Sequence, residues 1–558
     1  MESQTTIQLL KLIFFTLLSL TLALHAILSF TSSSSNLIDQ KLVIILSNNK
    51  LIVFSFLWCT LVSILAYIST RPLPVLLLNY TCFKPDHDRR CTLELCEYVG
   101  LRSRRYSEES ADFMRAIYRK SGLGDETYAP LFLFQTDYEA KFHYAILEAE
   151  EGMFSSASSV LSKSGVSPSE ITVLIVACSM FAPSPSLSSF VVNHLKLPSN
   201  VKTFNLSGMG CSAGTMAMDL AGSILRHRIG YALLVITEST SLNWYFGDNR
   251  HMLVTNCIFR AGTAAALMTS DPSRRWSAKM ELIRTLRTHH GADDAAYNAA
   301  IQREDENGNI GVALTKDLVR VAGAGLKGHI TTLAPRVLPV SELLKFAYLV
   351  VKSMFRGDKK TQHVPDFTTA FEHMCIHAGG KAVIDSVARL MKFSDKVVEP
   401  ARMCLHRFGN TSSSLVLYEF AYFEAKGRIK AGDRVWMLAF GTGFKACSVV
   451  WRALQDSWMD ADNPWRDCIH RFQAGSGQSG PLGRDTEAGQ GIRVEHSCLT
   501  ILLKQIGQTP SGLEEYFHQS AVQLCSMISQ NLMLYSYLFS LHMCAASEFA
   551  GEFGFGSE

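Results

Sequence analysis

The residues best suited to chemistry lie in one short glycine-rich stretch, NLSGMGCSAG, which runs from Asn205 to Gly214. Its cysteine, Cys211, stands on a glycine turn directly before a helix-like run. The positive end of a helix dipole lowers the pKa of a nearby thiol and favours the nucleophilic thiolate. Because most cysteines are simply small buried hydrophobes, the assignment of Cys211 as a nucleophile depends on partners elsewhere in the chain.

The same stretch permits two other interpretations. Gly210 to Gly214 also fits G-x-S-x-G, the nucleophile elbow of serine hydrolases and thioesterases, with Ser212 as the attacking residue. Gly208, Gly210 and Gly214 miss the dinucleotide-binding fingerprint by one residue. Both interpretations stay open until the partner residues are considered.

The second half of the chain supplies candidate partners for the thiol. His377 follows a strand-like run and precedes a glycine turn, and Asn410 follows a glycine where a helix is expected to begin. A helix N-cap explains Asn410 equally well when it is taken alone. His373 and His377 are spaced like a metal-binding pair, but the glutamate of HExxH is missing, Gly379 would interrupt a helix, and no third ligand is obvious. We therefore expect no metal site.

The elements that must position these residues are short apolar strands alternating with amphipathic helices, from about residue 71 to residue 454. This alternation is typical of an α/β fold. Strands are predicted over 171–180, 231–240 and 264–270, a helix over 137–164, and a polar lead-in arm over 80–120.

Two apolar runs precede the α/β part, over 12–30 and 51–68, in a chain of 558 residues. Each is about long enough to cross the hydrocarbon core of a bilayer. A cleaved signal peptide is the competing interpretation of the first run, but this run lacks an A-x-A site and is followed by a second apolar run. We predict a two-helix transmembrane hairpin, and the basic residues that follow it favour both ends on the cytosolic side.

Net charge and cysteine content narrow the possible partners and the redox state of the thiols. The formal net charge is only +3, which gives no indication of a nucleic-acid-binding surface. The 14 cysteines are scattered, and the chain is too long to need a disulfide framework, so we expect reduced thiols.

Seven motifs together resemble those of plant 3-ketoacyl-CoA synthases, the membrane-bound condensing enzymes of very-long-chain fatty acid elongation. These enzymes belong to the thiolase-like superfamily, with chalcone synthases and bacterial ketoacyl-ACP synthases. The resemblance extends from the N-terminal apolar runs to about Phe472. The motifs are SGLGDETYAP (121–130), NLSGMGCSAG (205–214), LNWYFGDNRHMLVTNCIFR (242–260), RTHHGADD (287–294), AFEHMCIHAGGKAVID (370–385), HRFGNTSSS (406–414) and NPWRDCIHRF (463–472).

The resemblance implies a duplicated five-layer αβαβα sandwich that forms a homodimer. After a membrane anchor over 1–70, an N-terminal half over 71–360 would carry the nucleophile and a C-terminal half over 361–472 its partners. By position, Cys211 would accept the acyl group, and His377 with Asn410 would handle malonyl-CoA. The family also marks histidines that match His289, His373 and His406 as needed for activity.

The implied reaction condenses an acyl-CoA with malonyl-CoA and needs no metal or redox cofactor. The implied partners are the ketoacyl reductase, dehydratase and enoyl reductase of an elongase complex. The implied location is the endoplasmic reticulum membrane, with the catalytic part facing the cytosol. Two alternatives remain, a serine hydrolase that uses Ser212 and a non-catalytic elongase subunit.

The C-terminal tail over 473–558 departs from the family pattern, which would end within a few residues of Gln473. Residues 473–491 are rich in Gly, Ser and Gln, a composition typical of disorder. No function is assigned to this tail.

Overall fold

The computed structural model describes residues 72–135, 138–356 and 364–472, together with Trp58, Thr60, Leu61 and Ser63. The chain divides into two compact units, Met1–Leu73 and Pro74–Glu558. The predicted membrane spans and the tail over 473–558 lie outside the described residues, except for those four helical positions of the second span. Within the described residues, no helix combines the length and the hydropathy needed to cross a membrane.

A large mixed sheet organises the described part of the second unit. Its nine strands follow the order β11-β12-β13-β8-β1-β7-β6-β4-β5. The strand bounds are β1 Leu76–Phe83, β4 Ile171–Ala177, β5 Lys202–Leu206, β6 Tyr231–Ile236, β7 Thr263–Thr269, β8 Met280–His289, β11 His373–Ile376, β12 Arg434–Gly441 and β13 Lys445–Ala453. Two short antiparallel pairs accompany it, β2 (Arg90–Cys91) with β3 (Thr127–Tyr128) and β9 (Ala300–Glu304) with β10 (Ile310–Leu314).

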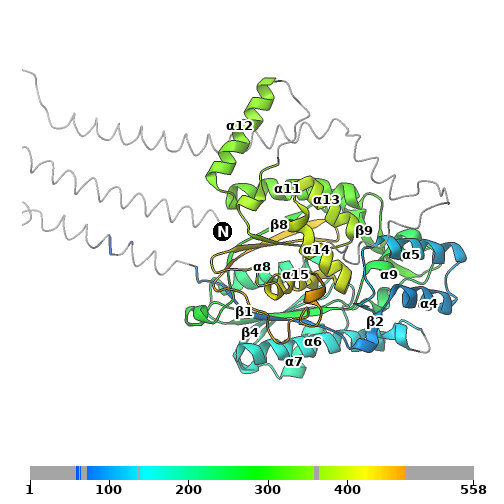
Figure 1. Ribbon diagram of the computed structural model, residues 1–558. Helices are drawn as coiled ribbons and strands as arrows, with labels where there is room; N and C mark the ends of the chain where they lie inside the picture. The colour runs from blue at the N-terminus through cyan, green and yellow to red at the C-terminus, as the bar shows by residue number, and fades with distance from the viewer. Residues whose placement is uncertain are drawn as a thin grey trace, which may run out of the picture. The chain divides into compact units, whose positions relative to one another are not determined.

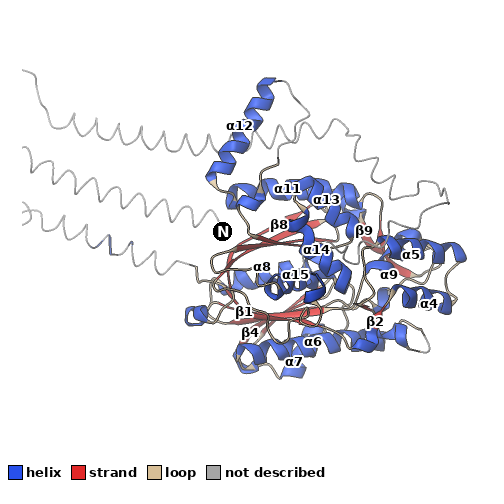
Figure 2. Ribbon diagram, viewed as in Figure 1, coloured by secondary structure: helices blue, strands red, loops and turns tan. Residues whose placement is uncertain are grey.

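The strands of the large sheet form two layers that are joined through β1. This strand pairs along its length with β7, but it meets β8 through only two residue pairs, Leu76 with Glu281 and Leu77 with Met280. Helices α8 (Ala213–Leu225) and α15 (Leu415–Ala425) lie between the layers (Figure 1). Helices α6 (Phe142–Ser164) and α7 (Leu187–Leu195) cover one outer face, and α11 (Leu318–Val337) and α13 (Lys381–Met391) cover the other (Figure 2).

The five layers explain the apolar character of the sequence. On β1, Leu77 packs into the central core whereas Leu76 and Leu78 pack into the core under α6 and α7. Strands that are covered on both faces need side chains that are apolar in both directions. Helix α15 is buried from Leu415 to Glu424, because a helix in the middle layer has no solvent-facing side.

The predicted lead-in arm over 80–120 is wrong. Strand β1 continues to Phe83, and helices α4 (Leu93–Ser103) and α5 (Glu108–Lys120) fill most of the remainder. Part of the charge that gave the segment its polar character belongs to α5, which nevertheless buries Met114 and Tyr118. Both helices pack in one cluster with α9 (Arg250–Ile258) (Figure 1). The other α-helices of the described residues are α10 Asp294–Asn298, α12 Val340–Arg356 and α14 Asp395–Phe408.

Candidate active site

Cys211 lies on a single 3-10 turn, η4 (Gly210–Ser212), that leads directly into α8. The tip of the β12–β13 hairpin packs against this turn. A Cβ on Gly210 would lie 2.5 Å from the backbone nitrogen of Thr442, and one on Gly441 would lie 2.2 Å from the carbonyl oxygen of Met209. Because neither contact leaves room for a side chain, glycine is required at both positions.

Two residues that the sequence analysis did not select surround the thiol. The hydroxyl oxygen of Ser412 lies 3.6 Å from the Cys211 sulfur, and it donates a hydrogen bond to the Glu238 carboxylate at 2.9 Å. Glu238 follows β6, is 2% exposed and also accepts hydrogen bonds from the backbone of Ser179 and Met180. The available signal was an acidic side chain directly after a buried strand, in the run VITEST.

Burial controls the charge at this site. It raises the pKa of Cys211 to about 12, although hydrogen bonds from Ser412 and Asn410 act in the opposite direction. Burial also raises the pKa of Glu238 to about 7, against the hydrogen bonds that stabilise its ionised form. The prediction of a lowered thiol pKa at the helix start is therefore wrong for this structure, because desolvation outweighs the hydrogen bonds that favour the thiolate.

His377 lies one residue beyond β11, where its backbone nitrogen donates to Leu438 of β12 at 2.9 Å. Its ring is buried, and neither ring nitrogen has a hydrogen-bond partner in the described part of the chain. Desolvation lowers the pKa of His377 to about 4, so the imidazole is neutral near neutral pH. A buried ring with unused nitrogens is costly unless a ligand uses them, so His377 is suited to contact a substrate.

Asn410 connects the surroundings of Cys211 with those of His377. Its side-chain oxygen accepts a hydrogen bond from the backbone of Ser412 at 2.8 Å, and its amide nitrogen donates to the carbonyl of Gly379 at 3.3 Å. Gly379 belongs to the turn that begins at His377. The N-cap of α15 is Ser414, so Asn410 does not cap that helix. The structure therefore brings Cys211, His377 and Asn410 to one site through Ser412 and Gly379.

Comparison with known proteins identifies the family. The family model described as FAE1/Type III polyketide synthase-like protein matches residues 67–355, and the C-terminal model of 3-oxoacyl-[acyl-carrier-protein] synthase III matches residues 368–453. 3-Ketoacyl-CoA synthase 2 of Arabidopsis thaliana is 46% identical over 83% of this chain and 90% of its own length. 3-Ketoacyl-CoA synthase 11 of the same plant is 48% identical over 73% of this chain and 80% of its own.

The chain belongs to the 3-ketoacyl-CoA synthase family. It is a condensing acyltransferase. Solved structures confirm a thiolase-like fold of the type III polyketide synthase kind. The C-terminal polyketide synthase domain of Steely1 from Dictyostelium gives a TM-score of 0.55 at 18% identity, over 68% of this chain and 99% of that domain. Polyketide synthase I of the brown alga Ectocarpus siliculosus gives 0.55 at 17% identity, over 69% and 99%.

The neighbouring serine of this synthase is not arranged as a nucleophile. Ser212 is fully buried, and its hydroxyl donates to the carbonyl of Met209 at 3.0 Å. Its other side-chain contact in the described residues is the sulfur of Met216 at 3.5 Å, and neither contact is a base. A serine hydrolase needs a histidine within hydrogen-bond reach of the hydroxyl, so the geometry disfavours the Ser212 interpretation.

The other three predicted histidines have contacts away from the thiol. His289 is exposed at the end of β8 and accepts a hydrogen bond from the backbone of Gly291 at 3.0 Å. His373 opens β11, where its Nε2 lies 2.9 Å from the carboxylate of Asp433. His406 in α14 packs against Phe472, and a Cβ on Gly124 would lie 2.4 Å from its ring. The contacts of His373 and His406 are those of residues that hold elements in place.

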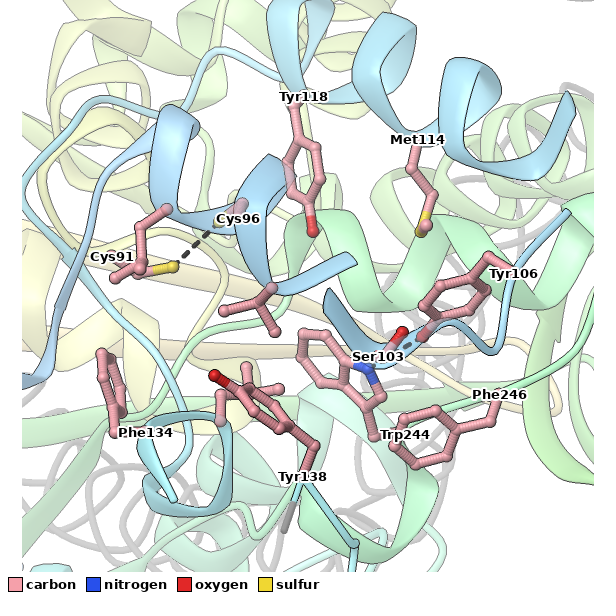
Figure 3. Close-up of a pocket in the computed structure, with 13 residues that line it drawn as sticks. Cys91, Cys96, Ser103, Tyr106, Met114, Tyr118, Phe134, Tyr138, Trp244 and Phe246 are labelled. Carbon is pink, nitrogen blue, oxygen red and sulfur yellow. Dashed lines mark hydrogen bonds between the residues drawn. The ribbon is translucent and has the colours of Figure 1, made fainter. Parts of the chain in front are cut away.

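An apolar cleft opens beside the site of the synthase, between α4, α5 and the loop around Trp244 (Figure 3). The end of α9 separates the two regions. Phe259 forms a backbone bridge with Asn410, and the backbone nitrogen of Arg260 donates to the carbonyl of Asn410 at 2.9 Å. On its other side, the Arg260 guanidinium lies 3.6 Å from the sulfur of Cys96 in the cleft wall. The lining residues are Cys91, Leu95, Cys96, Val99, Ser103, Tyr106, Met114, Tyr118, Leu133, Phe134, Tyr138, Trp244 and Phe246.

The described residues contain no group of three or more His, Cys, Asp or Glu side chains placed to hold a metal ion. The predicted absence of a metal or redox cofactor stays a prediction.

Proposed function

We propose that this chain condenses malonyl-CoA with a long- or very-long-chain acyl-CoA, releasing carbon dioxide and forming a 3-oxoacyl-CoA that is two carbons longer. This is the first step of fatty acid elongation. The single observation that carries the proposal is the meeting of a partly exposed thiol, a neutral buried imidazole and an amide at Cys211, His377 and Asn410.

In the first half-reaction, the sulfur of Cys211 attacks the thioester carbon of the acyl-CoA, and CoA leaves as its thiol. Because the pKa of Cys211 is raised to about 12, the thiol needs a proton acceptor. Ser412 lies between the thiol and Glu238, whose pKa of about 7 leaves part of the population ionised at neutral pH. We assign Glu238 the role of accepting the proton through the Ser412 hydroxyl.

In the second half-reaction, malonyl-CoA loses carbon dioxide, and the electron pair of the broken bond forms an enolate. Negative charge then develops on the thioester oxygen. Asn410 offers the amide N–H that also interacts with Cys211, and neutral His377 offers one ring N–H. Donors that are fixed before the charge develops stabilise it without reorganisation. The enolate carbon finally attacks the acyl thioester, and the Cys211 thiolate leaves.

The apolar cleft is the place we propose for the hydrocarbon chain of the acyl group. Its lining is almost entirely apolar, and Phe259 and Arg260, which follow α9, lie between it and Asn410. Each methylene removed from water contributes about 0.8 kcal/mol, so a long chain gains more from such a cleft than a short one.

We propose the endoplasmic reticulum membrane as the location, with the catalytic part in the cytosol. The two apolar runs over 12–30 and 51–68 and the basic residues after them support this topology. Helix α12 adds support, because Val340, Leu344 and Tyr348 recur every fourth residue and are 70%, 64% and 62% exposed. We further propose a homodimer that works with the reductases and dehydratase of an elongase complex.

The test is product analysis with purified full-length protein, a series of acyl-CoAs and labelled malonyl-CoA. The expected products are labelled 3-oxoacyl-CoAs and one carbon dioxide for each condensation. Release of free fatty acid without consumption of malonyl-CoA would support the hydrolase instead. A well-folded protein with no turnover on any acyl-CoA would support the non-catalytic subunit.

A further inference from the structure

Two cysteines outside the active site form a close pair in the wall of the apolar cleft. Cys91 ends the short strand β2, and Cys96 lies in the first turn of α4. Their sulfur atoms are 2.9 Å apart (Figure 3), and the residues are only 4% and 9% exposed. Since the sulfur atoms of a disulfide are about 2.05 Å apart, the two thiols need to approach by less than about 1 Å to form one.

The groups around the pair also favour the reactive thiolate form of Cys96. Nη2 of Arg260 donates to the Cys96 sulfur at 3.6 Å, and Arg260 is 3% exposed. The hydrogen bond from Cys91 and the charge of Arg260 lower the pKa of Cys96 to about 7 in spite of its burial. The pKa of Cys91 is raised well above its usual value by the same hydrogen bond and by burial. The pair therefore combines a thiolate with a neighbouring thiol, as redox-active dithiols do.

We propose that Cys91 and Cys96 are a modification site, a dithiol that hydroperoxides oxidise reversibly to a disulfide. The Cys96 thiolate attacks a peroxide oxygen, which breaks the O–O bond and leaves a sulfenic acid and, after protonation, water. The Cys91 sulfur then attacks the Cys96 sulfur, and the second oxygen leaves as water with the Cys91 proton. In sum, two thiols and one hydrogen peroxide give one disulfide and two waters.

The surroundings of the pair favour reduction of the disulfide back to two thiols. In the reduced state Arg260 faces the Cys96 thiolate, and its Nε donates to the hydroxyl of Thr127 at 2.9 Å. A disulfide carries no charge, so oxidation removes the anionic partner of a buried guanidinium. Loss of one partner of a buried charge pair is costly, and stabilising the reduced form makes a disulfide easier to reduce. The disulfide would therefore be one that a glutathione buffer reduces.

Trypsin makes the proposal directly testable, because Arg90 precedes Cys91 and the next cleavage site is Arg102. Both cysteines fall in one peptide, CTLELCEYVGLR (residues 91–102). The purified full-length chain is treated with hydrogen peroxide, denatured with N-ethylmaleimide, digested and analysed by mass spectrometry. We expect this peptide to become lighter by two hydrogens and unlabelled, and to regain both labels after reduction with glutathione. The peptide ACSVVWR (residues 446–452), which carries the buried Cys447, serves as the internal control and keeps its label.

Any two thiols that are close in sequence can form a disulfide. The rates of disulfide formation in the folded and the unfolded chain show whether the folded structure promotes the reaction. At pH 7, a pKa near 7 in place of about 8.5 gives roughly 15-fold more thiolate, but that thiolate is about fivefold less nucleophilic. The folded chain should therefore form the disulfide about threefold faster than the urea-unfolded chain. Equal rates in both states would overturn the proposal. So would a folded chain whose 91–102 peptide keeps both labels, or carries a sulfinic acid on Cys96 instead of the disulfide.

Two variants complete the test. In Cys91→Ser, oxidation should leave Cys96 as a sulfenic acid that dimedone traps. In the matched variant Cys447→Ser, the 91–102 disulfide should form at the rate of the unchanged chain. Failure of dimedone to label a folded Cys91→Ser protein would contradict Cys96 as the attacking sulfur.

Discussion

At the residue scale, Cys211 is placed to react but is held protonated by its burial. Cys211→Ser should abolish condensation, because a hydroxyl at this position lacks the nucleophilicity of a thiolate. Ser212→Ala should retain most activity, since among the described residues the Ser212 hydroxyl bonds to a backbone carbonyl and a thioether and to no base. Steady-state assays with labelled malonyl-CoA measure both. An active Cys211→Ser with an inactive Ser212→Ala would reverse the assignment.

Asn410 provides a prediction that separates the half-reactions. Asn410→Ala removes one of the two proposed enolate donors, and losing one such donor typically slows a reaction about 100- to 1,000-fold. Decarboxylation should fall by that factor, whereas acylation of Cys211 should persist. Carbon dioxide release and the mass of the acyl-enzyme measure the two steps independently. Normal decarboxylation in a folded Asn410→Ala protein would limit Asn410 to positioning the site through its hydrogen bonds.

Glu238 makes stability depend on pH in a defined direction. Its pKa is about 7 in the folded protein against 4.5 as the reference, so the folded state binds the proton more tightly. That contribution is fully present below pH 4.5 and is lost as the pH rises to about 7. Relative to the unchanged chain, Glu238→Gln should therefore gain up to about 3 kcal/mol between pH 5 and pH 8. Melting temperatures of both proteins at the two pH values measure this gain, and a constant difference between the proteins would show that Glu238 does not titrate in this range.

The sequence made Cys211, His377 and Asn410 candidates because each lies in a recognisable motif at a glycine turn. It did not identify Ser412 or Glu238 as parts of the site. Ser412 reaches the thiol from a backbone with φ of 57°, which few residues adopt outside glycine and asparagine, and Glu238 reaches Ser412 across 174 positions of sequence. Nor did local spacing predict the pKa of Cys211, because the degree of burial depends on the packing of both halves.

At the element scale, the contact between the β12–β13 hairpin and the Cys211 turn predicts a sharp difference between two glycines. Gly210 and Gly208 have positive φ values of 61° and 67°, so alanine is strained at either position. Only at Gly210 would the new Cβ also lie 2.5 Å from the backbone of Thr442, since nothing lies within 4 Å of a Cβ at Gly208. Gly210→Ala should lower the melting temperature and the rate of Cys211 acylation more than Gly208→Ala does. Equal effects would mean that the β12–β13 hairpin moves away from the new Cβ without a loss of stability or activity.

The elements around the site were largely predictable, and the exceptions have a physical reason. Apolar runs predicted β4, β6, β7 and α8 within a few residues, because strands and helices of a doubly covered sheet are apolar over most of their length. Helices α4 and α5 were missed, because α5 buries only Ser110, Met114 and Tyr118 and exposes many charges. A narrow buried stripe on a charged helix gives a weak signal to sequence analysis.

At the scale of the whole molecule, the proposed topology predicts which part of the chain a protease can reach. With both apolar runs in the membrane and the segment after residue 71 in the cytosol, protease added to sealed microsomes should digest the catalytic unit without detergent. Antibodies against a lumenal protein report whether the vesicles are sealed. A catalytic unit that survives until detergent is added would place it on the lumenal side.

Strand β1 determines where a shortened chain that lacks the first unit can begin. It begins two residues after the boundary at Pro74, and it is the strand that joins the two layers of the sheet. Its Leu76, Leu77 and Leu78 fill both cores. A shortened gene for crystallisation should therefore start at or before Pro74. A start after Phe83 would divide the sheet and remove part of the surface that α6 and α15 cover, so the product should accumulate in inclusion bodies.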